Sequence, residues 1–421
     1  MQVFKFGGAS VKNADAVRNV TTILNKYKGK PLVVIISAMG KSTNALEAIH
    51  QCIVHNEGDV KQHIATFTAF HDHIIDELFK LDRSWLKEHV ANLFSRVLKL
   101  SGEEFTGNQD ELYDHIVSIG ELTSTLIIDN HLKCSGLNSI WVDARTLIKT
   151  DSNFKEGRIN WGLTESLMRS QLIPNVSETS VVVTQGFIAS DTNNRTTTLG
   201  REGSDYSAAV FAYCLGAKEM TIWKDVPGVL NADPRKFENA VKLDEVSFKE
   251  AIELAYYGAS VIHPRTIQPL QRKEIKMYVK SFVDPELPGT MISQDAVTDT
   301  GIPSYITQEG QWLISVATKD FSFIVEEHLS QIFDTFSKHK VKIDIMQNSA
   351  VNFTAAVHNS EERLLGLIKD LQQEFDVKYN TSVELITIRH YNAEIIEELL
   401  GDREVFMEQR TRETFRALIG E

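Results

Sequence analysis

The sequence has few cysteines and no concentration of positive charge, and these absences exclude several classes of protein. Its 421 residues contain only three cysteines, Cys52, Cys134 and Cys214. They are widely separated and form no Cys-x-x-Cys pair, so neither a disulfide framework nor a cysteine metal site is expected. Acidic residues outnumber basic ones by 57 to 44, which gives a net charge of −13. Because no run of five Lys or Arg residues occurs, binding to nucleic acid is not expected.

Long hydrophobic runs are missing as well. The longest apolar stretches, such as Leu32–Ile36, are far too short to cross a bilayer. Lys5 interrupts the first apolar stretch, where a signal peptide would need its hydrophobic segment. With 42% hydrophobic and 24% charged residues, the sequence predicts a reduced, cytoplasmic, soluble protein with no membrane partner.

Short apolar segments alternate with helical patterns over the first 295 residues. The candidate buried strands are Val3–Phe6, Pro31–Ser37, Ile140–Val142, Val181–Thr184, Thr221–Trp223 and Met277–Val279. Most of the segment from about residue 60 to 132 reads as three helical stretches. Alternation of this kind predicts a mainly parallel sheet with helices on both faces. Ligands of such sheets lie beyond the carboxyl ends of the strands.

The pattern changes after two turn-rich segments, Asp284–Thr290 and Thr298–Pro303. Residues from Leu313 to a short strand beginning at Val377 follow the order β-α-β-β-α-β, which is typical of ferredoxin-like modules. The order then begins again but is incomplete. The expected second copy consists of a strand at Val383–Ile388, a helix at Ala393–Leu400, a strand at Val405–Met407 and a helix at Thr411–Leu418.

The first motif that could carry chemistry is Lys5-Phe-Gly7-Gly8-Ala-Ser10-Val. Glycines after a buried strand let backbone N–H groups approach an anion, and the following helix adds a partial positive charge. Lys5 would neutralise a transferring phosphoryl group. An ordinary strand-to-helix turn with a lysine that reaches solvent explains these residues about equally well.

A second glycine-containing segment, Ser37–Asn44, also follows a strand. It is not a Walker A loop, because Ile35 stands where that loop requires its first glycine. The Thr43 hydroxyl could contact a ligand, and it could equally cap a helix.

Three further side chains suit an amino-acid or phosphate ligand. Arg201 offers a planar fork for a carboxylate or phosphate. Asp205 could hold Lys5, although either Asp205 or Ser204 could merely cap the next helix. Glu121 could bind an ammonium group, whereas an exposed helical glutamate is the more common explanation for such a residue.

Taken together, these segments resemble aspartate kinase, of the amino acid kinase superfamily. The resemblance covers nearly the whole chain and rests on eight motifs in family order. The matching segments are KFGGASV (5–11), SAMGKSTN (37–44), GELTST (120–125), VTQGF (183–187), RTTTLGREGSD (195–205), IWKDVPGVLNADPR (222–235), YGASVIHP (257–264) and VDPELPGT (283–290).

The resemblance implies an α/β three-layer amino acid kinase fold with a mainly parallel sheet in residues 1–295. Ferredoxin-like α+β modules would follow, similar to the ACT domains that bind amino acids in this family. They would occupy residues 305–380 and 381–421, the second being incomplete. A homodimer or a higher homo-oligomer is implied as well.

The implied reaction is phosphorylation of the side-chain carboxylate of L-aspartate by Mg-ATP, the first step towards lysine, threonine and methionine. Lys5 would stabilise the phosphoryl charge and Asp205 would organise Lys5, while Mg²⁺ would ride on the phosphates with few protein ligands. Arg201 would clamp a substrate carboxylate and Glu121 would take the substrate ammonium. The other implied contacts come from Thr43 and Ser204 to the substrate, from Gly7, Gly8 and Ser10 to the phosphates, and from Lys224, Asp225, Leu230, Arg235 and Ser260 to the nucleotide.

Five positions depart from the family's usual residues. They are Ala9 for threonine, Glu202 for glycine, Lys224 for threonine, Leu230 for tyrosine and Ser260 for lysine. Glu202 and Ser260 keep open the alternative of a catalytically weak amino-acid-sensing regulatory protein. A related kinase that acts on glutamate, a carbamate or a nucleotide is a separate alternative.

The segment Lys342–Val351 resembles the family's effector-binding loop. Asp344 would take the ammonium of a lysine or threonine effector, while Gln347, Asn348 and Ser349 would bind its polar groups. An ordinary polar hairpin is the alternative reading of this segment.

Overall fold

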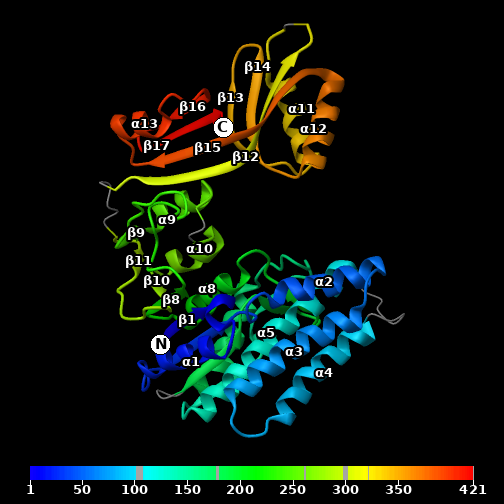
Figure 1. Cartoon of the computed structure of the whole chain (residues 1–421), viewed down its shortest axis with the longest axis vertical. Coiled ribbons are helices and arrows are strands. Elements are labelled where there is room, and N and C mark those ends of the chain that lie inside the picture. The colour runs from blue at the N-terminus through cyan, green and yellow to red at the C-terminus, as the bar shows by residue number, and fades with distance from the viewer. Residues whose placement is uncertain (101–107, 177–179, 260–261, 297–301, 321, 421) are drawn as a thin grey trace. The chain divides into compact units, whose positions relative to one another are not determined.

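The apolar strands of the first part of the chain assemble into one eight-stranded sheet (Figure 1). In spatial order these strands are β3 (Ser139–Val142), β5 (Val181–Gln185), β2 (Leu32–Ile36), β1 (Gln2–Phe6), β8 (Glu219–Lys224), β10 (Lys276–Ser281), β11 (Thr290–Ser293) and β9 (Glu245–Ser247). All neighbours run parallel except β10 and β11. The six predicted strands and the mainly parallel sheet are therefore confirmed.

The structure is a computed structural model that describes residues 1–100, 108–176, 180–259, 262–296, 302–320 and 322–420. The chain divides into two compact units. The first unit holds residues 1–229, 242–252 and 261–298, and the second unit holds 230–241, 253–260 and 299–421. The predicted nucleotide residue Ser260 and most of the Thr298–Pro303 boundary lie outside the described residues.

The helices of the first unit lie on both faces of the sheet. They are α1 (Ala14–Asn25), α2 (Ser42–His55), α3 (Val60–Leu78), α4 (Ser84–Leu100), α5 (Gln109–Cys134), α6 (Ala144–Leu147), α7 (Trp161–Leu167), α8 (Gly203–Leu215), α9 (Phe248–Tyr256, which runs into the second unit) and α10 (Pro264–Arg272), with short helical turns η1 (Gly8–Val11), η2 (Met168–Leu172) and η3 (Ile173–Asn175). Phe4 and Phe6 join one apolar cluster with α1, α3 and α5. Helix α8 is absent from that cluster and packs against β1, β2 and β8. Because strand side chains alternate between faces, the arrangement has three layers.

Helix α5 is the longest described helix in the first unit, and most of its residues are buried. It begins at the Asn108 cap, whose side chain accepts the Glu111 N–H at 2.7 Å, and it runs for 26 residues. Its middle, from Ile116 to Thr125, is buried on every side. Among the described residues, no helix has the length and apolar character needed to span a bilayer.

A small second sheet lies beside this helix in the first unit. It contains β4 (Lys149–Thr150), β6 (Ile188–Asp191) and β7 (Thr196–Thr198). Strand β7 packs against α5 and ends just before the Gly200–Asp205 segment. The small sheet therefore brings that polar segment to the vicinity of α5.

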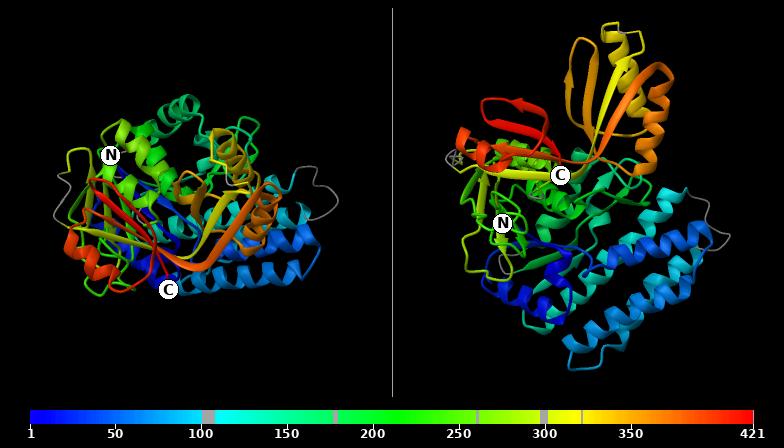
Figure 2. Two further views of the ribbon diagram at one scale, coloured as in Figure 1. Left: turned by 90° about the horizontal axis from the view of Figure 1, so that it is seen from above. Right: turned by 45° about the horizontal axis from the view of Figure 1, so that its top comes forward.

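The second unit is built on a six-stranded antiparallel sheet with the order β13-β14-β12-β15-β17-β16. Its elements are β12 (Ser304–Thr318), α11 (Glu326–Lys338), β13 (Ile343–Asn348), β14 (Asn352–Val357), α12 (Glu361–Glu374), β15 (Phe375–Arg389), α13 (Ala393–Leu400), β16 (Val405–Arg410) and β17 (Thr414–Gly420). Helices α11 and α12 lie side by side (Figure 2). The predicted β-α-β-β-α-β order is confirmed.

Two predictions for the C-terminal segment are wrong. The strands expected from Val377 and at Val383–Ile388 are one 15-residue strand, β15. The expected helix at Thr411–Leu418 is strand β17, paired on both sides. Phe415, Ala417 and Ile419 face one apolar cluster while Leu418 faces another. Burial on both faces removes the alternation that identifies a half-buried strand.

Strand β12 is also longer than the predicted strand Leu313–Ala317. Its first half, Ser304–Gln308, pairs with the second half of β15. The incomplete second copy thus obtains a strand from upstream of the first copy, which covers the apolar side chains that its own residues would leave exposed.

Candidate active site

The carboxyl ends of β1, β2 and β8 converge on the glycines that follow β1. Gly8 lies so close to the β2 turn that a Cβ there would stand 2.8 Å from the Gly40 carbonyl oxygen and 2.9 Å from that of Ala38. Only glycine permits this approach of two backbones. The buried Ser10 hydroxyl donates to the Trp223 carbonyl oxygen at 3.4 Å, which ties the same turn to β8.

Lys5 and Asp205 form an ion pair at this edge of the sheet. The Lys5 Nζ lies 2.6 Å from the Asp205 Oδ1, and only 12% and 6% of their side chains are exposed. Lys5 comes from the inner strand β1 and Asp205 from the first turn of α8. The pair brings a fixed positive charge beside Gly7 and Gly8, with its carboxylate partner anchored at a helix N-terminus.

Glu121 is a buried carboxylate in the middle of α5. It is 3% exposed, and its Oε1 accepts the Ala38 N–H at 3.3 Å. Its Oε2 has no hydrogen-bond partner among the described residues. Burial raises the pKa of Glu121 to about 8, although the Lys5 charge and the backbone donors oppose the rise. A buried carboxylate oxygen without a donor is costly, so this atom is suited to meet a ligand cation.

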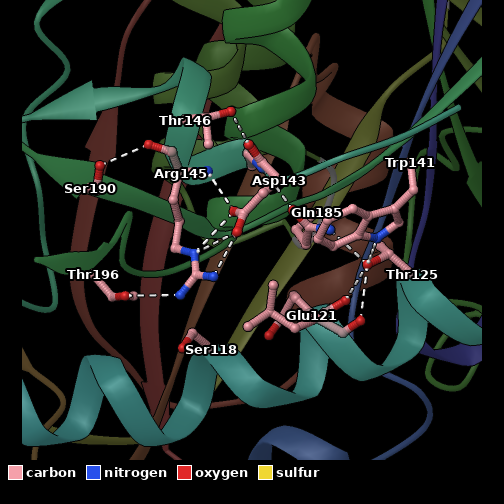
Figure 3. A network of polar contacts seen from close by, with 12 residues as sticks. Ser118, Glu121, Thr125, Trp141, Asp143, Arg145, Thr146, Gln185, Ser190 and Thr196 are labelled. Carbon is pink, nitrogen blue, oxygen red and sulfur yellow. Dashed lines mark hydrogen bonds and ion pairs between the residues drawn. The ribbon is translucent and has the colours of Figure 1, made fainter. Parts of the chain in front are cut away.

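The turn of α5 that carries Glu121 is anchored by a polar network (Figure 3). The Thr125 hydroxyl donates to the Glu121 carbonyl oxygen at 2.8 Å. It accepts hydrogen bonds from Trp141 Nε1 at 2.9 Å and from Gln185 Nε2 at 2.7 Å. The Gln185 Oε1 in turn accepts the Ala144 N–H at 2.7 Å. Strands β3 and β5 therefore fix the position of Glu121 through Thr125.

The Gly200–Asp205 segment joins β7 to α8. Arg201 is exposed, whereas Ser204 is half-buried. A Cβ at Gly186 would stand 2.6 Å from the Ser204 Cβ, so the turn after β5 lies directly against the start of α8. Glu202 has φ +53°, a left-handed conformation that favours glycine. Its Oε2 accepts the His263 N–H at 2.9 Å, which fixes the segment to the start of α10.

The other predicted site residues fall in several places. Thr43 is half-buried in the first turn of α2, and Lys224 is half-buried at the end of β8, followed by the exposed Asp225. Leu230 and Arg235 belong to the second unit, where Arg235 pairs with Asp233 at 2.6 Å. The structure thus pairs Lys5 with Asp205. Gly8 and Glu121 both lie against the backbone of Ala38. The roles of all these residues stay predictions.

The predicted effector residues lie on β13 and its turn in the second unit. The Asp344 Oδ2 accepts a hydrogen bond from Gln311 Nε2 at 3.2 Å, and its carbonyl oxygen accepts one from Arg416 Nη1 at 2.8 Å. Gln347, Asn348 and Ser349 are exposed. The Ser349 N–H donates to the Asn352 carbonyl oxygen at 2.8 Å, which closes the hairpin.

Sequence reasoning missed one deeply buried polar group near the site. Asp114 on α5 is fully buried and accepts hydrogen bonds from Lys155 and Thr198. The signal was an aspartate two helical turns before Glu121, but its partners lie 41 and 84 positions away in sequence.

Comparison with known proteins identifies the family and the fold. The model of the amino acid kinase family matches residues 1–281. The chain is 30% identical over 385 residues to the lysine-sensitive aspartokinase 3 of Escherichia coli strain K12, covering 91% of this chain and 84% of that protein.

Two solved structures of Escherichia coli aspartokinase III are similar over the whole chain. One is a complex with lysine and aspartate, at a TM-score of 0.83 and 27% identity, covering 100% of this chain and 96% of that one. The other is a complex with aspartate and ADP, at a TM-score of 0.81 and 26% identity, with the same coverage.

Proposed function

The chain belongs to the amino acid kinase family as an aspartate kinase, and on this premise we propose how its residues transfer phosphate. The substrate is L-aspartate, whose side-chain carboxylate attacks the γ-phosphate of Mg-ATP to give 4-phospho-L-aspartate and ADP. The observation that carries the proposal is the buried, unpartnered Glu121 oxygen at the same sheet edge as the Lys5–Asp205 pair.

Catalysis at this site rests on position and charge. The attacking carboxylate is already anionic, so no residue has to remove a proton from it. Lys5 neutralises charge that spreads over the transferring phosphoryl group, and Asp205 holds the Lys5 ammonium in place. The backbone N–H groups at Gly7 and Gly8 donate hydrogen bonds to the phosphates, because glycine leaves the backbone open to an anion there.

Aspartate is gripped at both ends of its α-amino-acid group. The Glu121 carboxylate receives the substrate ammonium, which supplies the donor that Oε2 lacks. Arg201 is free to fold its guanidinium onto the α-carboxylate in a bidentate contact. Ser204 and Thr43 add hydrogen bonds. Binding of aspartate and ADP by the similar aspartokinase III supports this choice of substrates.

The nucleotide contacts of the first unit come from Lys224 and Asp225, at the carboxyl end of β8. The sequence resemblance adds Leu230, Arg235 and Ser260 as further nucleotide contacts. Mg²⁺ enters as part of Mg-ATP, and phosphate oxygens supply most of its ligands, since the carboxylate at the phosphate loop, Asp205, is paired with Lys5.

An amino-acid effector regulates the enzyme through the second unit. Lysine is the first candidate effector and threonine the second, acting through Asp344 and the hairpin residues Gln347, Asn348 and Ser349. The lysine complex of the similar aspartokinase III supports this order. The protein forms a homodimer or larger homo-oligomer. Its free thiols accord with a reducing, cytoplasmic location.

One assay tests the activity against its alternatives. ADP release is measured with L-aspartate, with L-glutamate and without an acceptor, each in the presence and absence of lysine and of threonine. We expect aspartate-dependent release that lysine lowers. Release with glutamate only would indicate another amino-acid kinase, whereas no release with either acceptor would indicate a sensing protein.

A further inference from the structure

A second buried carboxylate, Asp114, lies on the same helix as Glu121 and takes no part in the proposed chemistry. It is fully buried. Its Oδ2 accepts the N–H groups of Lys155 and Thr198, both at 2.9 Å. Its Oδ1 accepts the Thr198 hydroxyl at 2.7 Å. Three donors from two distant segments therefore converge on one side chain.

These donors lead directly to the segment that carries Arg201. Thr198 is the last residue of β7, three positions before Arg201. Its carbonyl oxygen accepts the Gly157 N–H at 2.8 Å. Gly200, at φ +74°, is so close to the same loop that a Cβ there would stand 3.2 Å from the Lys155 carbonyl oxygen. Asp114 thus holds both the strand end and the loop against which Gly200 packs.

The position of Asp114 on α5 relates these contacts to Glu121. Asp114 and Glu121 are seven residues apart, about two helical turns, so they lie on one face of the helix roughly 10 Å apart along its axis. Glu121 is itself fixed through Thr125. The same helix therefore fixes Glu121 directly, and through Asp114 it fixes the segment that leads to Arg201.

We propose that Asp114 is a positioning residue that places Arg201 relative to Glu121, so that both can grip one aspartate molecule. This inference rests on the proposed function, in which those two residues bind the α-carboxylate and the ammonium. Burial raises the pKa of Asp114 to about 6 against the opposing hydrogen bonds. Burying such a carboxylate lowers the stability of the fold more than burying an apolar residue would. The benefit that we assign to it is the placement of the end of β7.

Asp114→Asn is the main test variant, because it keeps the volume and leaves an oxygen for the two N–H donors. It forces the Thr198 hydroxyl to reverse its hydrogen bond. Thr198→Val is the milder second variant, which loses only that hydroxyl and keeps both backbone bonds. We expect Asp114→Asn to raise the aspartate KM about tenfold, the usual scale for one disturbed bond to a charged group. The ATP KM should change less than twofold.

The same helix offers a matched control. Asp129 is 2% exposed and accepts hydrogen bonds from Ser139 Oγ and Lys133 Nζ, both at 2.7 Å. It lies eight residues beyond Glu121 along α5, whereas Asp114 lies seven residues before Glu121. Asp129→Asn should therefore lower the melting temperature as Asp114→Asn does, yet leave the aspartate KM unchanged.

A double-mutant cycle separates positioning from simple loss of stability. If Asp114 acts through Arg201, its substitution should lower kcat/KM for aspartate about tenfold in the wild type but less than twofold in Arg201→Lys, whose bidentate contact is already lost. Equal effects in both backgrounds, or equal rises of the aspartate and ATP KM values, would overturn the inference. So would a lower melting temperature with the aspartate KM unchanged in both variants.

The cycle also keeps this inference separate from the proposed function. If Arg201→Lys alone leaves the aspartate KM unchanged, the substrate assignment fails, and the placement of Arg201 by Asp114 fails with it. If Arg201→Lys raises that KM while Asp114→Asn and Thr198→Val do not, only the role of Asp114 is refuted.

Discussion

The buried position of Glu121 predicts that aspartate binding releases a proton. Burial raises the pKa of Glu121 to about 8 in the ligand-free protein. The substrate ammonium can pair only with the ionised carboxylate, so binding must lower this pKa. At pH 7 the Glu121 carboxyl is ionised in only about one ligand-free protein molecule in eleven. This weakens the binding of aspartate by about 1.4 kcal/mol.

The expected result is an aspartate KM that falls as pH rises. Near pH 6.5 the KM should drop close to tenfold for each pH unit. The fall should become shallower towards pH 8, and the KM should level off above that pH. Calorimetry in two buffers of different ionisation enthalpy should count about one proton released per aspartate bound near pH 7.

Glu121→Gln is the control, because the amide has the same shape and does not titrate. Its aspartate KM should be higher and independent of pH in this range, and the proton release should vanish. A wild-type KM that stays constant from pH 6.5 to 8.5, with no proton released, would show that Glu121 does not meet the substrate ammonium.

The same raised pKa fixes the sign of a stability effect. The folded-state pKa of Glu121 lies above the ordinary value of 4.5. The contribution of Glu121 to the stability of the ligand-free protein therefore falls as pH rises from about 4.5 to about 8, by about 1.4 kcal/mol per unit at most. Thermal denaturation with and without aspartate should reveal a larger ligand-induced shift at pH 8 than at pH 6.

Four other outcomes follow from the site and the second unit. Lys5→Ala should keep the fold and slow turnover by roughly 10²–10³-fold, because one electrostatic stabiliser is lost; a wild-type kcat would refute its phosphate role. Arg201→Lys should raise chiefly the aspartate KM, since lysine lacks the fork, and a raised ATP KM instead would place it with the nucleotide. Gln347→Ala should weaken inhibition by lysine, typically 5–150-fold when such coupling is lost, with kcat preserved; equal inhibition would place the effector elsewhere. Light scattering should give at least twice the 47.5 kDa of one chain, and a monomer mass at micromolar concentration would contradict assembly.

The sequence predicts those parts of this molecule that depend on local pattern. The strand that carries Lys5 follows from a short apolar run that ends at Gly7 and Gly8. The family comparison confirms the assignment as an aspartate kinase. What the pattern cannot supply is the pairing of distant polar groups. Asp114 meets Thr198 across 84 positions, and no local rule connects them.

Burial of a strand on both of its faces is a second reason why predictions from the sequence were wrong. The segment Thr411–Leu418, predicted as a helix, instead leads into β17 at Thr414, a strand that is enclosed by β15 and β16 and buried along nearly its whole length. The two separate strands expected from Val377 and at Val383–Ile388 are one, because the polar residues between them continue β15. Both errors come from side chains whose neighbours belong to other parts of the chain.

The two long strands of the second unit have a consequence for the order in which it folds. Thr318 pairs with Phe375, and Ser304 pairs with Arg389, 85 positions later. The outer pairs enclose the whole first ferredoxin-like module, so they close the longer loop. Once the inner halves of β12 and β15 have paired, the outer halves need only continue the same ladder. The nested arrangement therefore makes the C-terminal copy a late-folding element whose formation waits for the module inserted within it.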